Sequence, residues 1–433
     1  MLRVLELFGG IGACSKALER LGIDYEIADY VEIDKYAVAS FNAMHNTDFK
    51  PQDIKEWNKD IKVDLIMHGS PCQDISVAGL QKGADKDSGT RSSLMYETIR
   101  IVDKLKPKYV IWENVKNLIG KKHKHNHDIY IYMLDKMGYN SYYQVLNAKD
   151  YGIPQNRERV FTISIRKDID KGYVFPSKQE LKLKLKDILE LQVDQKYYLS
   201  EEQQKKISAW KSYRNPIEEA KYLDDDYSPC LTAKGNTSNN ASMLLIKNAT
   251  KKGYLEATEG DGIDLTNPES KTRRGRVQKE MSQTLTTQNN LGVCIGTYQF
   301  SKSDKFMKGK DRFQEGKEIS DTLQTSPKKA VVIKPTLLGG IGEKKSNGGT
   351  QYYQQNRIYD NECAVSVTTM SNHYYKNLGI RKLTPKECWR LMGFDDTDFD
   401  KASKVNSDTQ LYKQAGNSIV VNCLEKILNN LLK

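Results

Sequence analysis

Residues 63–73 read Val-Asp-Leu-Ile-Met-His-Gly-Ser-Pro-Cys-Gln, an apolar run that leads directly into glycine, proline and cysteine. A short apolar run of this kind is typical of a strand that is buried on both faces of a sheet. A second apolar run, at residues 109–112, leads into Glu113. Because α/β folds carry their sites at the carboxyl ends of the strands, we expect Cys72 and Glu113 to lie near each other.

Two explanations of Cys72 are open at this point. Taken alone, Cys72 is best explained as a small buried hydrophobe, because most free cysteines are buried for packing. A thiol beside a carboxyl group, however, is also what an enzyme needs to activate an electron-poor aromatic ring for alkylation at carbon. The rest of the sequence has to decide between the two explanations.

Strand and helix signals alternate through residues 1–175. Apolar runs predict strands at residues 2–8, 25–31, 63–68, 109–113, 142–146 and 159–165. Helical spacing of apolar residues predicts helices at 13–21, 34–44, 93–105 and 129–137. This alternation is typical of a doubly wound, mainly parallel α/β sheet.

The character of the chain changes after about residue 172, where Lys and then Asn, Thr, Gly and Ser become frequent. A loose repeat recurs at residues 228–232, 282–287, 320–325 and 365–369, and each copy is followed by a polar turn and a short aliphatic run. Arg276, Arg312 and Arg357 precede the last three copies. Alternating polar and apolar residues, a turn and an aliphatic strand predict repeated β-hairpins. We therefore expect a second, mostly β domain at residues 176–378, and a return to the first domain at residues 379–433, where residues 414–418 open a helix through Ile419 to Leu432.

The composition describes a polar and basic chain. Its 433 residues include 67 Lys and Arg against 56 Asp and Glu, which gives a formal net charge of +11 and favours a polyanionic partner. No apolar run approaches the length that crosses a bilayer, and no signal peptide is recognisable. Seven cysteines without a CxxC pair favour free thiols in a reducing cytoplasm. We expect no metal, and we interpret His123, His125 and His127, which lysines flank, as part of a solvated basic loop.

A glycine-rich turn, Phe-Gly-Gly-Ile-Gly at residues 8–12, follows the first predicted strand. Glycines allow the backbone to turn tightly and to approach a ligand at the N-terminus of the next helix. Glu32 ends the second strand, where a carboxylate suits a ribose diol, and Asp53 is placed to accept from an adenine amino group. Taken singly, each carboxylate is better explained as a solvated surface residue. The ordered set favours a cofactor that contains adenosine.

Together these residues resemble the DNA (cytosine-5) methyltransferases. The matching elements follow the order of that family, at residues 8–12, 32–35, 53, 71–73, 113–115, 155–159, 381–394 and 416–418. The resemblance implies an α/β fold of the S-adenosylmethionine-dependent methyltransferase type with a second, mostly β target-recognition domain. It assigns residues 1–175 to the catalytic and cofactor-binding domain, 176–378 to target recognition, and 379–433 to a hinge helix and a C-terminal segment that returns to the catalytic domain.

The cofactor that this resemblance implies is S-adenosyl-L-methionine. One departure from the family is Ile33, where an aromatic residue often lies beside the adenine, and it predicts a weaker affinity for the cofactor. The expected cofactor-binding residues are Phe8, Gly9, Gly10, Gly12, Glu32, Ile33, Asp53, Ile54, Pro71, Leu94, Asn417 and Ser418.

The resemblance also implies a covalent mechanism on a flipped-out cytosine. C5 of cytosine is too weak a nucleophile to take a methyl group, but addition of the Cys72 thiolate at C6 makes C5 enamine-like. Glu113, as a protonated acid at N3, would draw charge from the ring, and Arg159 would help to lower the thiol pKa. The base must leave the duplex for this chemistry. The expected catalytic residues are Cys72, Glu113, Arg157 and Arg159.

The expected partner is duplex DNA. Arginine is the commonest reader of guanine edges and also a common phosphate anchor, so both roles stay open for the repeat arginines. We expect a cytoplasmic monomer in a prokaryotic or phage-infected cell, with a cognate restriction endonuclease as a candidate functional partner. The expected nucleic-acid contacts are Gln73, Ser76, Arg91, Gln155, Arg274, Arg276, Arg312 and Arg357.

Two other functions are compatible with these motifs. The first is an RNA (tRNA) cytosine-5 methyltransferase with the same site, although RNA members tend to have a compact variable region and this chain has a long one. The second is a DNA-binding protein with a dead active site, against which the intact Cys72, Glu113 and Arg159 argue. The recognised DNA sequence cannot be deduced from these residues.

Overall fold

The computed structural model describes residues 1–71, 94–207, 244–288, 290–300, 337–344, 350–359 and 374–433. The chain divides into two compact units. The first unit comprises Met1–Ala233, Met243–Ile295 and Gly379–Lys433, and the second comprises Lys234–Ser242 and Gly296–Leu378. The domain boundaries expected at residues 175 and 378 stay a prediction.

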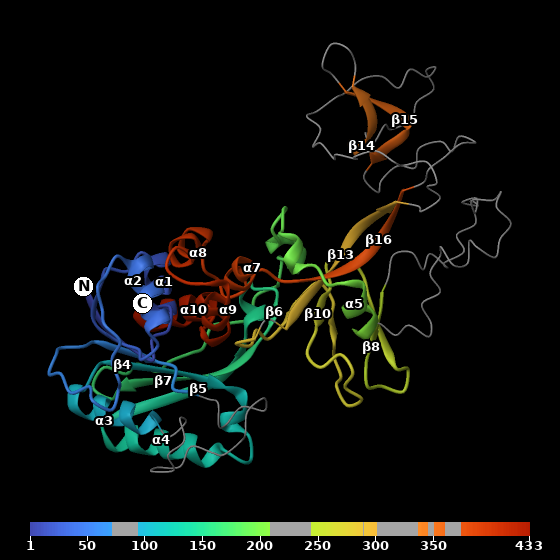
Figure 1. Ribbon diagram of the computed structural model, residues 1–433. Helices are drawn as coiled ribbons and strands as arrows, with labels where there is room; N and C mark the ends of the chain where they lie inside the picture. The colour runs from blue at the N-terminus through green and yellow to red at the C-terminus, as the bar shows by residue number, and fades with distance from the viewer. Residues whose placement is uncertain (72–93, 208–243, 289, 301–336, 345–349, 360–373) are drawn as a thin grey trace, which may run out of the picture. The chain divides into compact units, whose positions relative to one another are not determined.

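A six-stranded sheet in the order β2-β1-β3-β4-β7-β5 forms the centre of the first unit (Figure 1). Strands β2, β1, β3 and β4 are parallel, and β7 is antiparallel to both β4 and β5. The predicted α/β fold with a mainly parallel sheet is therefore confirmed. The strands are β1 (Leu2–Leu7), β2 (Tyr25–Val31), β3 (Leu65–His68), β4 (Tyr109–Val115), β5 (Tyr139–Asn147) and β7 (Glu158–Arg166).

Helices cover both faces of this sheet. Side chains of β1 alternate between two cores, so that Val4 packs in one cluster while Leu5 and Leu7 pack in the other. Helices α1 (Ala13–Arg20) and α10 (Val421–Leu432) contribute to the first core, and α3 (Met95–Leu105) and α4 (Lys124–Lys136) to the second (Figure 1). Burial on both faces explains the apolar runs at residues 65–67 of β3 and 109–112 of β4.

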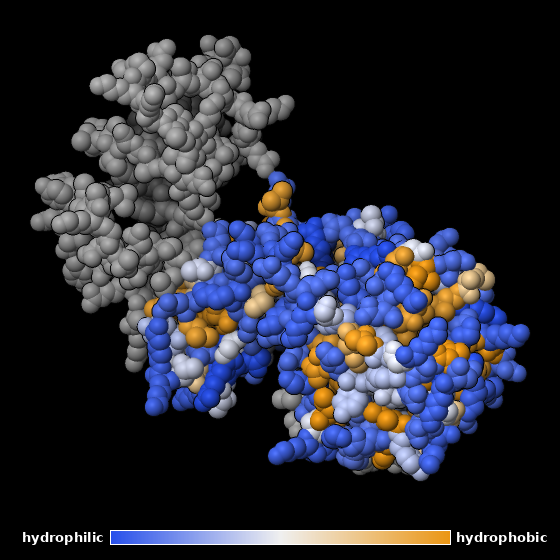
Figure 2. Space-filling view, turned by 180° about the vertical axis from the view of Figure 1, so that it is seen from behind, coloured by the Kyte–Doolittle hydropathy of each residue, from blue (hydrophilic) through white to orange (hydrophobic). Residues whose placement is uncertain are grey.

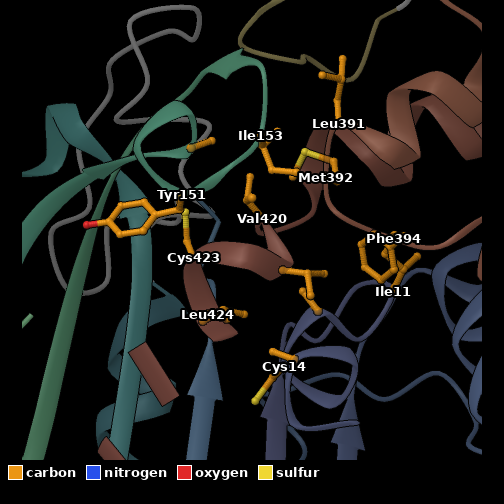
Figure 3. Close-up of a cluster of buried hydrophobic side chains, with 14 of the residues drawn as sticks. Ile11, Cys14, Tyr151, Ile153, Leu391, Met392, Phe394, Val420, Cys423 and Leu424 are labelled. Atoms are coloured by element: carbon orange, nitrogen blue, oxygen red, sulfur yellow. The ribbon is translucent and has the colours of Figure 1, made fainter. Parts of the chain in front are cut away.

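The C-terminal segment returns to the N-terminal core. It forms helices α7 (Pro385–Arg390), α8 (Asp396–Ser403), α9 (Asp408–Asn417) and α10. Figure 3 shows Cys423 and Leu424 of α10 in one cluster with Cys14 of α1 and Tyr151. Helix α10 agrees with the helix expected through Ile419 to Leu432. Most of the segment expected to open it belongs to the separate helix α9, because Ser418 and Val420 have extended backbone conformations between the two helices.

Between residues 200 and 382 the described elements are α5 (Glu201–Ile207) and a series of strands. Strands β8 (Leu244–Lys247) and β9 (Tyr254–Ala257) pair in antiparallel fashion, as do β14 (Leu337–Lys344) and β15 (Thr350–Tyr359) of the second unit. A four-stranded sheet has the order β11-β10-β13-β16. Its strands are β10 (Gly262–Asp264), β11 (Val277–Gln278), β13 (Leu291–Phe300) and β16 (Tyr374–Lys382).

The repeat copy at residues 282–287 does not form the predicted hairpin with the aliphatic strand that follows it. Its strand β12 (Ser282–Gln283) pairs in parallel with β6 (Gln155–Asn156), whereas β13 pairs with β10. The physical reason is that Leu285, two residues after β12, bonds through its backbone to Gln155 and Arg157, so the polar half of the repeat is held beside β6.

The face of the molecule in Figure 2 is mostly hydrophilic, with hydrophobic residues in separate patches. This mixture agrees with the mean hydropathy of −0.67. Within the part of the chain that the structure describes, no helix combines the length and the apolar character needed to cross a bilayer.

Candidate active site

The glycine-rich turn connects β1 to α1, and its conformation depends on glycine. Gly10 and Gly12 have φ angles of 55° and 77°, in the left-handed region that glycine adopts at little cost. A Cβ atom on Gly9 would lie 2.6 Å from the ring of Tyr30, whereas one on Gly10 would meet no atom within 4 Å. The turn is therefore packed tightly on its inner side and open at Gly10, which suits a backbone that approaches a ligand.

The predicted acidic residue Glu32 lies directly against this turn. One carboxylate oxygen accepts from Gly10 N at 3.1 Å, and the other accepts from Asp34 N at 2.8 Å. Burial raises the pKa of Glu32, and the two backbone hydrogen bonds oppose that rise. The neighbouring Ile33 is 67% exposed, so its side chain is free to cover a ligand.

The other predicted cofactor residues differ from one another in burial and in their distance along the chain from the glycine-rich turn. The backbone N–H of Gln52, the residue before Asp53, donates to Glu32 O. This hydrogen bond places Asp53 near the end of β2. Ile54 is only 4% exposed and packs in a hydrophobic core, so its side chain has little surface for a ligand, and its contact with the cofactor stays a prediction. Leu94 is partly buried against the same core.

A pocket joins the glycine-rich turn to the predicted catalytic acid. It brings together the end of β1, the segment after β3, the end of β4 and the segment between α9 and α10. These segments are far apart in the sequence, and several of the predicted site residues meet only here. The pocket is lined by Glu6, Leu7, Phe8, Gly9, Gly10, Ala13, Cys14, Met67, His68, Gly69, Glu113, Asn417, Ser418 and Ile419.

Glu113 lies at the end of β4 and is 8% exposed. Burial raises its pKa, and the positive charges of Arg159 and Arg157 partly offset the rise. The Nε atom of Arg159 lies 3.2 Å from Oε1 of Glu113. A carboxyl group whose burial favours the protonated form is suited to donate a hydrogen bond or a proton.

Side chains of β4 hold the segment that leads toward Pro71. The indole nitrogen of Trp112 donates to Oγ of Ser70 at 3.0 Å, and Nδ2 of Asn114 donates to the Ser70 carbonyl at 3.1 Å. These two residues flank Glu113 on its strand. Our prediction missed this support because nothing in a single sequence indicates that a serine and a tryptophan meet across a sheet.

The contacts of Gln155 and Arg157 differ from the roles that we predicted for them. Gln155 is fully buried, and its amide donates to Leu391 O at 2.9 Å and accepts from Leu285 N at 3.3 Å. It therefore has no free group for DNA, and the predicted nucleic-acid contact is corrected.

The guanidinium of Arg157 is bonded to backbone carbonyls. Arg157 is 3% exposed and donates to the carbonyls of Leu285, Gly416 and Ser418 at 3.1, 3.2 and 2.7 Å. These bonds join the repeat segment to the end of α9. Arg157 is therefore a positioning residue, and this corrects its predicted place among the catalytic residues.

Arg276 is also buried. Its guanidinium donates to the carbonyls of Asp264, Thr266 and Asn267 at 3.2, 2.8 and 2.5 Å. The side chain holds a loop of the protein and has no surface for a base or a phosphate, so its predicted DNA contact is corrected. Arg274, by contrast, is exposed, and its Nε atom donates to Ala249 O at 3.0 Å. It stays a predicted DNA contact.

Several predicted residues lie outside the described part of the chain. They are Cys72, Gln73, Ser76, Arg91 and Arg312. Arg357 lies in β15, but its side chain is not among those described. The roles of these residues stay predictions.

Two of the three histidines near α4 are not solvated as we predicted, whereas His125 is exposed. His123 and His127 are almost fully buried, and the ring of His127 bonds to Oγ1 of Thr162 at 2.9 Å. Burial lowers the pKa of His127 to about 4, so that its ring stays neutral. Among the described residues, no cluster of three or more His, Cys, Asp or Glu side chains is arranged to hold a metal ion.

The family model of the C-5 cytosine-specific DNA methylases matches residues 2–433. This chain belongs to that family. The orphan methyltransferase M.SPRI of Bacillus phage SPR is 33% identical, over 100% of this chain and 97% of that protein. The type II methyltransferase M2.ScrFI of Lactococcus lactis subsp. cremoris is 29% identical, over 100% of this chain and 99% of that protein.

Solved structures agree with the fold of this methylase. A mutant of DNMT2 from Spodoptera frugiperda aligns with a TM-score of 0.54 at 17% identity and covers 100% of both chains. The predicted family and α/β fold are thus confirmed by sequence and by structure.

Proposed function

We propose that this methylase transfers a methyl group from S-adenosyl-L-methionine to C5 of cytosine within a short recognition sequence of duplex DNA. The observation that carries the proposal is the pocket in which the glycine-rich turn, Glu113 and the segment at Ser418 meet. In this family of methylases, a cofactor-binding backbone beside a buried acid supports methyl transfer to a pyrimidine ring.

The residues of the pocket fit the cofactor. The open backbone at Gly10, the carboxylate of Glu32 and the exposed Ile33 offer polar and apolar contacts to an adenosine. Asp53, Phe8, Pro71, Leu94 and the residues at 417–418 complete the proposed set. When bound, S-adenosyl-L-methionine supplies the methyl group of a sulfonium ion.

Cys72 is the proposed nucleophile. Its thiolate adds to C6 of a cytosine that has left the duplex, and Glu113 gives a proton or a hydrogen bond to N3, so that the ring charge moves toward C5. After C5 has taken the methyl group, loss of the C5 proton and expulsion of the thiolate restore the aromatic ring. Arg159, beside Glu113, is placed to contact the same base.

Radiolabelled methyl transfer tests this function. Wild-type protein is expected to label duplex DNA, and bisulfite sequencing of DNA from expressing cells is expected to show methylation at one short sequence. Methyl transfer to tRNA alone would show that the substrate is RNA and not DNA. Transfer to neither nucleic acid would contradict the proposed activity.

A duplex that contains 5-fluorocytosine tests the covalent step. Fluorine blocks the final elimination, so wild-type protein is expected to form an adduct that survives denaturation, whereas Cys72→Ala is expected to form none. An adduct with the alanine variant would show that another residue is the nucleophile.

The relatives of this methylase differ in whether a restriction endonuclease accompanies them by name. Some relatives are named orphan methyltransferases and others type II methyltransferases, so the cognate restriction endonuclease stays a prediction. The monomeric state and the cytoplasmic location also stay predictions.

A further inference from the structure

The inner side of the glycine-rich turn rests on a tyrosine from the neighbouring strand. Tyr30 of β2 is fully buried, and its hydroxyl donates to Gly10 O at 2.5 Å. A Cβ atom on Gly9 would lie 2.6 Å from the Tyr30 ring, so ring and turn are in close contact. No part of the pattern that identified the turn in the sequence includes this residue.

The position of the tyrosine ring is itself fixed. The ring stacks on Phe41 of α2 (Lys35–His45), with centroids 3.9 Å apart and an angle of 22° between the planes. Phe49 lies on it at 5.6 Å in a tilted arrangement. Because the aromatic rings are closely packed, the hydroxyl of Tyr30 has little freedom to move. The Gly10 carbonyl can therefore accept its hydrogen bond in one position.

The peptide groups of the turn are held from both directions. Gly10 N donates to Glu32, and Gly10 O accepts from Tyr30, while Gly9 N donates to Val31 O at 3.3 Å. Gly10 has a left-handed φ of 55°, one of several backbone conformations that are open to a glycine. The three hydrogen bonds select this one, which leaves the Gly10 Cα facing open space.

We propose that Tyr30 is a positioning residue for S-adenosyl-L-methionine, because its hydroxyl fixes the Gly10 peptide in the conformation that the cofactor contacts. This inference rests on the proposed function, since it assumes that the turn binds that cofactor. A turn that is already ordered binds a ligand without the entropic cost of ordering it. Loss of the hydroxyl is therefore expected to weaken cofactor binding, although Tyr30 has no contact with the reacting atoms.

Tyr139 of β5 provides a matched control. It is also fully buried, and its hydroxyl also donates to a backbone carbonyl, that of Pro107, at 2.6 Å. Neither tyrosine lines the pocket, but Tyr30 bonds to Gly10, which does, whereas Tyr139 bonds to Pro107, which does not. Tyr30→Phe and Tyr139→Phe thus remove the same kind of hydrogen bond, and only the first removes it from the turn.

Isothermal titration of the full-length variants with S-adenosyl-L-methionine and with S-adenosylhomocysteine tests the proposal. Both variants are expected to lower the Tm by similar amounts. Only Tyr30→Phe is expected to raise the Kd, by about threefold to tenfold, the factor that one hydrogen bond of ordinary strength corresponds to. The KM for the cofactor is expected to rise in parallel, with kcat nearly unchanged.

Hydrogen exchange supplies a second measurement on the cofactor-free protein. The amides of residues 9–12 are expected to exchange faster in Tyr30→Phe than in wild type or in Tyr139→Phe. Phe41→Leu, which keeps the hydroxyl but loosens its support, is expected to raise the Kd in the same direction by a smaller factor.

The outcomes separate this inference from the proposed function. If wild type does not bind the cofactor, the proposed function fails and this inference fails with it. If wild type binds and Tyr30→Phe binds equally well, only the role of Tyr30 is overturned. An equal loss of affinity in Tyr139→Phe would also overturn it, because the effect would then be one of general stability.

Discussion

Among the described residues, Glu113 is the one on which the proposed chemistry depends most directly, through its buried carboxyl group. Burial raises its pKa, and Arg159, with Nε 3.2 Å from a carboxylate oxygen, lowers it again. Burial is the larger of the two effects. Glu113 can therefore hold its proton while the positive charge of Arg159 lies beside it. This combination suits a group that protonates a ring nitrogen.

Replacement of this acid should affect chemistry more than binding. Glu113→Gln is expected to lower kcat by a factor on the order of 10² to 10⁴, the usual contribution of general acid catalysis, with little change in the Kd of the cofactor. Single-turnover methylation and titration calorimetry measure the two quantities. Glu158→Gln, which changes an exposed carboxylate paired with Lys116, is the control. A wild-type rate in Glu113→Gln would exclude the acid role.

A second buried carboxyl group predicts how stability depends on pH. Glu6 accepts hydrogen bonds from the backbone and the hydroxyl of Ser15, yet burial raises its pKa from 4.5 to about 7. Below pH 4.5 the group is protonated in both the folded and the unfolded protein. As the pH rises toward 7, the unfolded protein loses this proton first, so the free energy of unfolding decreases.

Glu6→Gln should remove this dependence, because the amide oxygen can accept the same bonds without titrating. The decrease in Tm between pH 5 and pH 8 is expected to be smaller in the variant than in wild type. Thermal unfolding followed by circular dichroism at several pH values measures the difference. Parallel Tm curves for the two proteins would contradict the raised pKa.

Short elements from different parts of the chain meet where β12 pairs with β6. Gln155 and Arg157 bind the backbone of the repeat segment at Leu285, and Arg157 also binds the end of α9. A Cβ atom on Gly416 would lie 2.3 Å from Thr286 O, so the two backbones are in direct contact. The polar half of this repeat is therefore part of the wall of the catalytic region.

The arginines before this repeat predict two different effects. Arg274→Gln is expected to weaken DNA binding and to reduce the slope of log K against log salt by about 1, because an exposed cation on a phosphate is lost. Arg276→Gln is expected to lower the Tm, since its buried guanidinium holds the loop at residues 264–267. Salt-dependent binding and thermal unfolding distinguish the two. A DNA-binding loss confined to Arg276→Gln, with unchanged stability, would reverse these assignments.

The sequence was most informative about elements whose pattern is local. The strands β1 to β4 and the helix α10 follow from apolar runs and from apolar residues at helical spacing. The contacts that Arg157 makes with the carbonyls of Gly416 and Ser418 join parts that are far apart in the sequence, so no local pattern indicates them. In the same way, Arg276 and Gln155 have polar side chains that predict exposure, and only the fold shows that backbone carbonyls surround them.

At the scale of the whole molecule, the first and last parts of the chain form one core. Helix α10 packs with α1, and Lys413 of α9 pairs with Asp34 at 2.7 Å beside Glu32. Gln414 accepts a hydrogen bond from the hydroxyl of Ser40 of α2 at 2.9 Å. The first unit thus depends on contacts between the first and the last part of the sequence.

A substitution in this shared core should destabilise the whole catalytic unit. Leu424→Ala, at a fully buried position of α10, is expected to cost about 2–5 kcal/mol of unfolding free energy. Urea unfolding measures the loss, and bound S-adenosyl-L-methionine is expected to restore part of it. Leu432→Ala, at a partly buried position on the same helix, is the control. Equal losses in both variants would contradict the shared core.

The late position of α10 in the chain has a consequence for biosynthesis. Translation proceeds from the N-terminus, so α1 leaves the ribosome long before α10 is made. Until α10 has emerged, the apolar face of α1 has no covering helix. The core that α1 and α10 share can therefore form only after most of the first unit has been synthesised.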